Sequence, residues 1–261
     1  MLRQWASYIA VPTWITDHEG HLLYFNEPVE PIIGVRLDEA GDMVAGELVE
    51  SFDICDPDGK PLENYERPLI IALDKQMPAY RRIGIRVDGS QRLLDVTAIP
   101  LVNTDDRQVG AMATLWPVGS VPDPNLTSPA LGDQQLPIEL ILTRQWASRL
   151  AVPTWLSDPN GNLLYYNEAA AALTGVGPSD GDLPVGSHTE LFRVLDLEGK
   201  PLTTDDLPIA TALGHRVAAH RAMRLLGLDG TWRTIEATAL PLVGQNHCFL
   251  GGVALFWEMG P

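Results

Sequence analysis

The sequence predicts an α+β fold that occurs twice along the chain. The first observation is an internal repeat, because residues 3–7 (RQWAS) recur as residues 144–148 and residues 10–14 (AVPTW) recur as residues 151–155. The second observation is a set of short strands separated by Asp- and Gly-containing turns in each copy. The third is an amphipathic helical pattern at the start of each copy. Strands that follow one another usually pair, so antiparallel sheets with associated helices are expected.

The repeat also predicts the domain organisation. Residues 3–34 and 144–175 share 18 identities in 32 positions, and similarity continues to the end of each copy. Residues 1–117 are therefore expected to form one domain and residues 137–261 a second. The segment between them, residues 118–136, is rich in Pro, Gly, Ser, Asp and Asn, and this composition is typical of an extended linker.

Composition excludes some partners. The 261-residue chain has 34 acidic and 18 basic side chains and a net charge of −16. Such a chain is repelled by nucleic acid and by anionic membrane surfaces, and no apolar run reaches the length of a membrane span. Two cysteines cannot form a disulfide framework. These features favour a cytoplasmic protein with an acidic surface that faces a protein partner.

Each copy can be read as a series of elements. In the first copy we expect a helix over residues 2–9, strands over residues 13–16 and 22–25, and a helix that opens near Glu66. Three closing strands are expected over residues 80–87, 92–100 and 109–116. Alternation places Leu94, Val96 and Ala98 on the inner face of the sheet, and Asp95 and Thr97 on the opposite face. The shared carboxylates Asp95 and Glu236 are expected to be exposed. Ile235, Ala237 and Ala239 are the inner-face counterparts in the second copy.

The marks of the two copies resemble the PAS family. In the first copy they include residues 11–17 (VPTWITD), 23–26 (LYFN) and 58–62 (DGKPL), followed by Asp88-Gly89 and by residues 98–101 (AIPL). The resemblance covers nearly the whole chain outside the linker. It implies two domains, each with a five-stranded antiparallel sheet in the order 2-1-5-4-3, helices over one face that enclose a small pocket, and an N-terminal flanking helix. It also implies a sensory or protein-interaction role, and no output domain of the family is recognised on the chain.

The resemblance leaves the cofactor unknown, and the residues argue against two candidates. Covalent flavin needs a cysteine in a helix motif after Asn26 or Asn167, and neither position is followed by one. Haem needs an axial histidine, but His215 follows the second helix in one copy only, and Lys75 stands at that position in the other copy. No histidine is shared between the copies and no pair has the spacing of a metal site, so no metal is expected.

Several shared residues are candidates for a pocket that binds a small molecule. The polar candidates are two asparagines, for which helix capping is the alternative, and two arginines, for which salt bridges are the alternative. The apolar candidates come from the inner face. The full set is Asn26, Asn167, Arg81, Arg221, Leu94, Val96, Ile235 and Ala237. We identify no catalytic constellation and expect no enzymatic activity.

Three pairs of tryptophans are shared by the two copies. They are Trp5 and Trp146, Trp14 and Trp155, and Trp116 and Trp257. Trp14 and Trp116 are expected to meet at one rim of the sheet, with Trp5 above them. This group is either a hydrophobic seal or an interface between copies or between chains, which includes a homodimer.

Two functions remain open from the sequence. The first is a sensor or signal relay that binds a small molecule, a protein partner or both, without catalysis. The second is a dimerisation or scaffold module whose pockets are filled by its own side chains.

Overall fold

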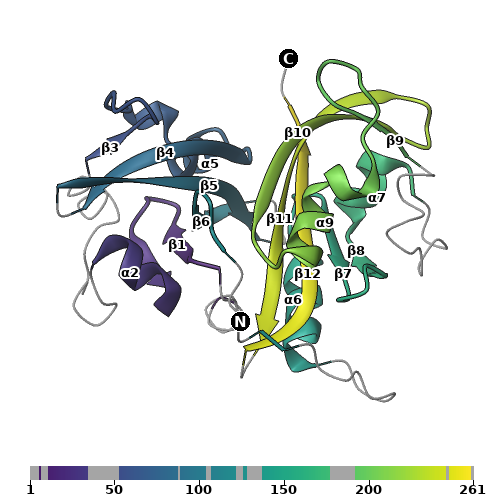
Figure 1. Cartoon of the computed structure of the whole chain (residues 1–261), viewed down its shortest axis with the longest axis horizontal. Helices are drawn as coiled ribbons and strands as arrows, with labels where there is room; N and C mark the ends of the chain where they lie inside the picture. The colour runs from purple at the N-terminus through teal and green to yellow at the C-terminus, as the bar shows by residue number, and fades with distance from the viewer. Residues whose placement is uncertain are drawn as a thin grey trace. The chain divides into compact units, whose positions relative to one another are not determined.

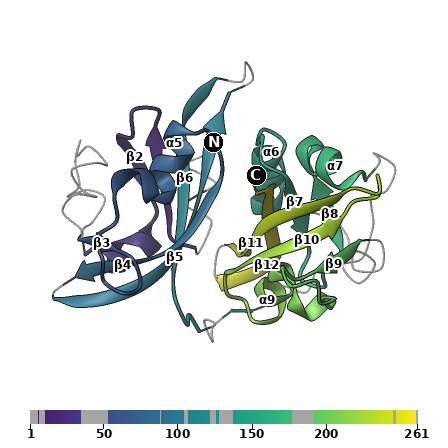
Figure 2. The ribbon, with the colours of Figure 1, turned by 90° about the horizontal axis from the view of Figure 1, so that it is seen from above.

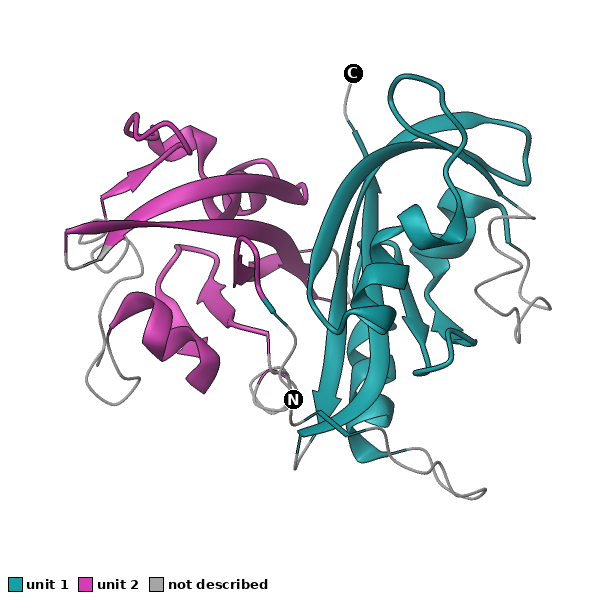
Figure 3. Ribbon diagram, in the orientation of Figure 1, with its two compact units in different colours: residues 1, 121–261 teal, residues 2–120 magenta. Residues whose placement is uncertain are grey.

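The chain divides into two compact units, Leu2–Ser120 and Val121–Pro261 with Met1, which we call the N-terminal and C-terminal units (Figure 3). The computed structural model describes residues 6, 11–34, 53–87, 89–103, 107–121, 126–127, 137–176, 192–244 and 247–259. Each unit is described by itself.

In the N-terminal unit the described strands form one antiparallel sheet of six strands in the order β2-β1-β6-β5-β4-β3 (Figure 1). Its strands are β1 (Thr13–Asp17), β2 (Leu22–Phe25), β3 (Ile54–Cys55), β4 (Ala79–Val87), β5 (Ser90–Val102) and β6 (Gln108–Pro117).

The C-terminal unit repeats this sheet in the order β8-β7-β12-β11-β10-β9. Its strands are β7 (Thr154–Ser157), β8 (Leu163–Tyr166), β9 (Arg193–Leu195), β10 (Ala219–Leu226), β11 (Trp232–Gly244) and β12 (Cys248–Glu258). The predicted order of five strands is therefore confirmed in both units. The sixth strand was missed because β3 and β9 are only two and three residues long, and each pairs with the edge of the sheet inside the loop-rich middle.

One face of each sheet is covered by short helices. These are η1 (Glu27–Val29), α2 (Glu30–Ile33), η2 (Asn64–Glu66) and α5 (Pro68–Asp74) in the N-terminal unit, and α7 (Glu168–Thr174), η3 (Thr204–Asp206) and α9 (Pro208–Gly214) in the C-terminal unit. We call this the inner face. Helix α5 lies against β4, β5 and β6, and α9 lies against β10, β11 and β12 (Figure 2). The predicted inner-face residues lie in these cores, with Leu94 beneath the helices of one unit and Ile235 beneath those of the other.

A longer helix, α6 (Ile138–Ala147), precedes the sheet of the C-terminal unit. It contacts β7, and a surface pocket between them is lined by Leu140 of α6 together with Leu156 and Tyr165 of the strands. Leu156 is opposite Val253 in the sheet, whereas Trp155, which packs on the inner-face core, is opposite Ala254. Because neighbouring residues of a strand point to opposite faces, α6 covers the outer face. The flanking helix expected over residues 2–9 lies outside the described residues, apart from the buried helical residue Ala6.

The outer face carries a buried carboxylate where we expected an exposed one. Asp95 is 7% exposed, and its carboxylate accepts hydrogen bonds from the Tyr80 hydroxyl at 2.7 Å and from Arg82 Nε and Nη2 at 2.8 and 3.0 Å. The expectation of an exposed position was wrong because alternation fixes the face on which a side chain lies and not the burial of that face. The buried charge is compensated by a bidentate ion pair.

Glycine is required where β6 meets β1 and where β12 meets β7. A Cβ at Gly110 would lie 2.0 Å from the carbonyl oxygen of Thr16, and a Cβ at Gly251 would lie 2.0 Å from that of Ser157. Both glycines have positive φ values, 158° and 128°. This close approach of two backbones explains why glycine occurs at both positions.

A described part of the expected linker is attached to the C-terminal unit. Thr127 forms an isolated parallel bridge with Cys248, and Arg216 donates a hydrogen bond of 2.6 Å to the carbonyl of Leu126. These contacts attach the segment to the start of β12. No helix in the described residues combines the length and the hydrophobicity of a membrane-spanning segment.

Candidate ligand cavity

The N-terminal unit contains a cavity of about 260 Å³ between the inner face and the helices. Its walls are mainly apolar and come from β1, β4, β5, β6, α2 and α5. Leu94, Val96 and Ala113 contribute from the sheet, and Leu69 and Leu73 contribute from α5. Two of the predicted pocket residues, Leu94 and Val96, therefore line the cavity.

The core of the C-terminal unit carries a larger side chain at one position that lines the cavity in the N-terminal unit. Val96 pairs with Leu115 in the first sheet, and at the matching positions Ala237 pairs with Phe256. The ring of Phe256 contacts the ring of Trp155 edge-on, with centroids 5.0 Å apart. Phe192 contacts the same indole at 5.9 Å. Aromatic side chains thus occupy the core of the C-terminal unit, and the predicted pocket residues Ile235 and Ala237 pack against them.

The two predicted asparagines do not contact the cavity. Asn26 is absent from its lining, and the side-chain amides of Asn26 and Asn167 form hydrogen bonds with the backbone of their own domains. Asn26 Oδ1 accepts from the backbone N–H of Thr13 at 2.8 Å, and its Nδ2 donates to the carbonyls of Val11 and Ala6. Asn167 Oδ1 accepts from the backbone of Thr154 at 3.0 Å, and it also caps α7 through Ala170 N at 2.9 Å. Both side chains are almost fully buried. The capping alternative applies to Asn167, whereas the Asn26 side chain does not cap η1.

The Asn167 amide also ties the chain that precedes the sheet to the first strand. Its Nδ2 donates to the carbonyls of Ala147, Leu150 and Val152 at 2.8 to 3.1 Å. Ala147 is the last residue of α6, so the asparagine fixes the end of the helix relative to β7.

The two shared arginines also lie away from the cavity, where they form ion pairs. Arg81 Nη1 is 3.2 Å from Glu66 Oε1, and Arg221 Nη1 donates to the carbonyl of Asp206 at 2.6 Å. Arg221 is also 3.9 Å from the Asp206 carboxylate. The salt-bridge alternative therefore describes both side chains, and each joins its strand to the short helix beside it.

The tryptophan arrangement differs from the one we expected. Trp14 lies opposite Ala113 on the inner face and lines the cavity. Trp116 is three residues further along β6 and pairs with Asp95, so it lies on the outer face. The expected meeting of Trp14 and Trp116 at one rim was wrong, because an odd spacing along a strand reverses the face. Trp5 lies outside the described residues.

The C-terminal unit follows the same arrangement. Trp155 packs on the inner-face core, and Trp257, which pairs with Glu236, lies on the outer face and contacts the His220 ring at 6.0 Å. Trp146 is buried on α6. An interface role for these side chains stays a prediction.

Sequence reasoning missed Arg67, which lines the cavity just before α5. Its Nε is buried and has no hydrogen-bond partner, and its Nη2 makes only a 3.4 Å contact with the carbonyl of Leu62. The indole Nε1 of Trp14 is likewise buried without a partner. The signal in the sequence was a difference between the copies, because Leu207 stands at the position of Arg67.

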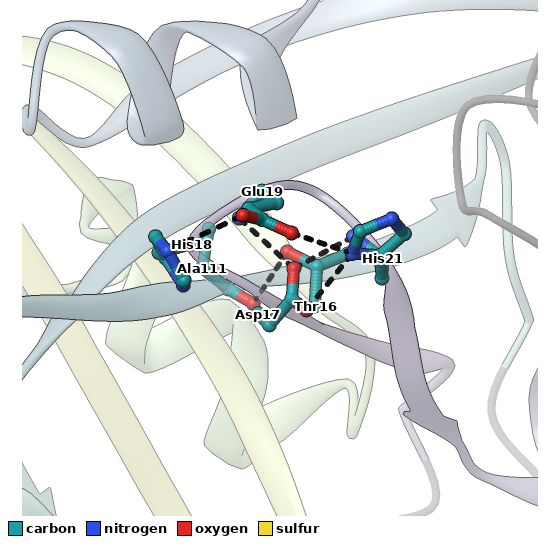
Figure 4. Close-up of polar contacts among 6 residues, drawn as sticks. All are labelled: Thr16, Asp17, His18, Glu19, His21 and Ala111. Atoms are coloured by element: carbon teal, nitrogen blue, oxygen red, sulfur yellow. Dashed lines mark hydrogen bonds and ion pairs between the residues drawn. The ribbon is translucent and has the colours of Figure 1, made fainter.

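The β1–β2 hairpin carries the one cluster among the described residues that could supply metal ligands (Figure 4). His21 Nδ1 lies 3.0 Å from Asp17 Oδ2 and 3.4 Å from Glu19 Oε2. Asp17 Oδ1 meanwhile accepts the backbone N–H groups of Glu19 and His21 at 2.9 and 2.8 Å.

The second copy explains this hairpin without a metal. Asp158 Oδ1 accepts the backbone N–H groups of Asn160 and Asn162, and Asp158 Oδ2 accepts the Asn162 side-chain amide at 2.8 Å. Asn162 thus takes the place of His21. The shared feature is an aspartate that organises a tight turn, and this turn accounts for the cluster.

The turn also sets the ionisation of Asp17. Burial would raise the pKa of this carboxyl group, but the hydrogen bonds from the backbone and ring of His21 and from the backbone of Glu19 outweigh it and lower the pKa from its ordinary value. The carboxylate form is favoured because the donors point at it.

Comparison with known proteins agrees with the architecture. A family model described as the PAS fold matches residues 1–118, and a second model described as the PAS domain matches residues 151–249. No protein with a curated description matches the chain.

The solved structures that are similar to the chain include two PAS domains and one light-oxygen-voltage receptor. The PAS domain of a protein from Colwellia psychrerythraea is 18% identical with a TM-score of 0.34, and the match covers 46% of this chain and 96% of that chain. The PAS domain of BvgS from Bordetella pertussis is 14% identical with a TM-score of 0.34, and the match covers 47% of this chain and 87% of that chain. An RNA-binding light-oxygen-voltage receptor is 13% identical with a TM-score of 0.36 over 95% of both chains.

Proposed function

Because the chain belongs to the PAS family and has two PAS domains in tandem, we propose that it is a non-catalytic sensor whose N-terminal domain binds a small molecule. PAS domains are generally sensory and signal-relay modules, and they are typically regulatory and not catalytic. The proposal assigns the sensing step to one domain and a protein-contact role to the other.

The observation that carries the proposal is the asymmetry between the two cores. A cavity of about 260 Å³ lies under α5 in the N-terminal domain, where Leu115 lines it, whereas Phe256 stands at the matching position of the C-terminal domain and packs on Trp155. Concave, mostly apolar cavities with a few polar groups are the usual form of small-molecule sites. A core filled with aromatic side chains instead favours a structural or contact role.

The protein partner is expected to present a basic surface. The chain carries 34 acidic and 18 basic side chains, and opposite charge speeds and orients the encounter of two proteins. Because the sequence also predicts neither nucleic-acid nor membrane binding, we expect the signal to pass by contact with a protein in the cytoplasm.

Native mass spectrometry of the freshly purified 261-residue chain tests the ligand proposal. We expect one additional small mass per chain, and we expect this mass to be absent from a Leu115→Phe variant, because Leu115 lines the cavity and Phe256 is its counterpart. A wild-type spectrum without bound mass would contradict the proposal. Turnover of a small molecule by the purified chain would contradict its non-catalytic part.

A scaffold role is the second candidate, and the filled core of the C-terminal domain is the observation that favours it. In this case both domains would serve dimerisation and no ligand would be needed. Dimerisation that persists with an unliganded wild-type chain would favour the scaffold over the sensor.

A further inference from the structure

Two hydrogen-bond donors of the cavity lining lack acceptors. The indole Nε1 of Trp14 and the guanidinium Nε of Arg67 are both buried from solvent, and neither has a hydrogen-bond partner in the described part of the fold. Trp14 as a whole is 5% exposed. Buried polar groups are nearly always paired in folded proteins, and those that are not call for an explanation. A ligand that supplies acceptors would explain both.

Arg67 adds a formal charge to this requirement. Its guanidinium is a cation, and no carboxylate among the described residues lies within ion-pair distance of it. The other titratable side chains of the lining, His18, Glu19 and Asp74, are exposed. Water screens these exposed groups, so the partly buried guanidinium is the dominant charge for a molecule inside the cavity. A partly buried cation without a counter-ion favours an anionic partner.

The rest of the lining limits the body of the ligand. Leucine, isoleucine, valine and alanine side chains from the sheet and from α5 make up most of the wall. A volume of about 260 Å³ holds on the order of ten non-hydrogen atoms at the packing density of protein interiors. The fitting molecule is therefore compact and mainly apolar, with its oxygen acceptors at one end.

The C-terminal domain differs from the N-terminal domain at two of the matching positions. Leu207 stands where the first domain has Arg67, directly before the proline that begins the helix, and it packs against the aromatic core. At a second position, Phe256 stands where Leu115 lines the cavity of the first domain. A purely structural role for Arg67 would not explain why the arginine is replaced in the domain that carries the larger side chain.

We propose that the cavity of the N-terminal domain selects a compact apolar carboxylate, with the carboxylate oxygens held by Trp14 Nε1–H and by the guanidinium of Arg67. This inference rests on the proposed ligand-binding function and adds the chemical class of the ligand. Bidentate recognition by a guanidinium is the usual way in which proteins select carboxylates.

Three probe molecules with ten non-hydrogen atoms each test the proposal on the 261-residue chain. They are phenylacetate, its neutral analogue phenylacetamide, and butylbenzene, and their binding is measured by titration calorimetry and by the shift of the Trp14 indole N–H signal in nuclear magnetic resonance spectra. We expect phenylacetate to bind at least tenfold more tightly than phenylacetamide. We also expect the Trp14 signal to move with phenylacetate and not with butylbenzene.

Two variants separate the role of each donor. Arg67→Leu, which installs the residue of the second domain, is expected to weaken phenylacetate at least tenfold and to leave butylbenzene within a factor of two. Trp14→Phe removes the N–H and keeps an aromatic ring, and it is expected to weaken both oxygen-bearing probes several-fold. Arg86→Leu is the matched control, because Arg86 pairs with Asp53 at the surface and does not line the cavity. It should change nothing.

The outcomes distinguish this inference from the proposed function. Equal binding of the three probes, or full retention of phenylacetate binding by Arg67→Leu, would overturn the carboxylate assignment and leave a ligand-binding cavity in place. No binding of any probe, together with a native mass spectrum without bound mass, would overturn both.

Discussion

Arg67 and Leu207 occupy the same position in the two domains, directly before Pro68 and Pro208; Arg67 lines a cavity, and Leu207 packs against the hydrophobic core. The backbone at the two positions is nearly the same, with φ of −80° and ψ of 130° and 143°. The difference therefore lies in the side chains and not in the local fold. The same local backbone thus presents a cationic side chain to a cavity in one copy and an apolar side chain to the core in the other.

Leu115→Phe should stabilise the N-terminal domain of ligand-free chain. The added ring would enter the cavity as Phe256 enters the core of the C-terminal domain, and cavity filling commonly raises stability by about 1 kcal/mol. Urea denaturation of the ligand-free protein measures the change. A loss of stability would show that the two cores differ in shape as well as in side-chain size.

Phe256→Leu should have the opposite effect in the C-terminal domain. The ring lies 5.0 Å from that of Trp155 and is 4% exposed, so its replacement leaves a void and costs about 1 to 2 kcal/mol. Thermal unfolding of the variant beside wild type measures this loss. If the new void binds butylbenzene but not phenylacetate, the contribution of Arg67 to selectivity in the first domain gains independent support.

The repeat made most of the fold predictable. A hairpin or an inner-face pattern that occurs in both copies is not a chance feature of one segment. The strand order and the core positions of Leu94 and Ile235 could therefore be predicted from the sequence. Arg67 could not be found in this way, because the same reasoning gave weight only to residues that both copies share. Arg67 stands out because the second copy has Leu207 at this position, and the structure is needed to show that Arg67 lines a cavity.

The burial of side chains and the face of the sheet on which they lie were also difficult to predict from the sequence. Alternation correctly placed Asp95 on the outer face, but it could not show that Tyr80 and Arg82 would surround it. Trp14 and Trp116 were placed together because their strands are neighbours, whereas the register of β1 against β6 puts them on opposite faces. Register depends on pairing between distant segments, which a local pattern does not contain.

Asn167→Ala should destabilise the C-terminal domain by about 3 kcal/mol, because it leaves buried backbone donors and acceptors of three segments without partners. Chemical denaturation measures the loss. Asn167→Asp is the informative control, because it keeps the acceptor for Thr154 and removes the two donors. It should be destabilising as well, and a fully stable Asn167→Ala variant would contradict the structural role of the amide.

His21→Asn should leave the stability of the N-terminal domain within about 0.5 kcal/mol of wild type, because Asn162 makes the equivalent contact in the second hairpin. Asp17→Ala should cost about 1 to 2 kcal/mol, since the turn loses an acceptor for two backbone N–H groups. Denaturation with and without added zinc is the measurement. A zinc-dependent gain in wild type that the His21→Asn variant lacks would contradict the interpretation of this cluster as a turn.

The lowered pKa of Asp17 adds a pH dependence with a defined sign. A carboxyl group whose pKa is lower in the folded state contributes stability at pH values above its unfolded pKa, and this contribution is lost as the pH falls through the folded value. Acid unfolding of wild type should therefore be steeper than that of Asp17→Asn. Identical acid profiles would mean that the hydrogen bonds of the turn do not persist in solution.

Glu236 should show the opposite sign. Burial raises the pKa of this carboxyl group, and the hydrogen bond with Trp257 offsets only part of the effect. Its contribution to stability is then fully present below the unfolded pKa and is lost as the pH rises through the folded pKa. Glu236→Gln removes this loss, so the variant should be more stable than wild type at neutral pH, and the two should converge in acid.

Asp95 provides the matched control for that measurement. It occupies the equivalent position in the first domain, but there Arg82 forms a bidentate pair with the carboxylate, whereas Ala222 stands at the position of Arg82 in the second domain. Asp95→Asn should therefore lower stability at neutral pH while Glu236→Gln raises it. The measurement is the urea midpoint of both variants and of wild type between about pH 4 and pH 8. If both substitutions change the stability in the same direction, the ion pair with Arg82 does not account for the difference between the two carboxylates.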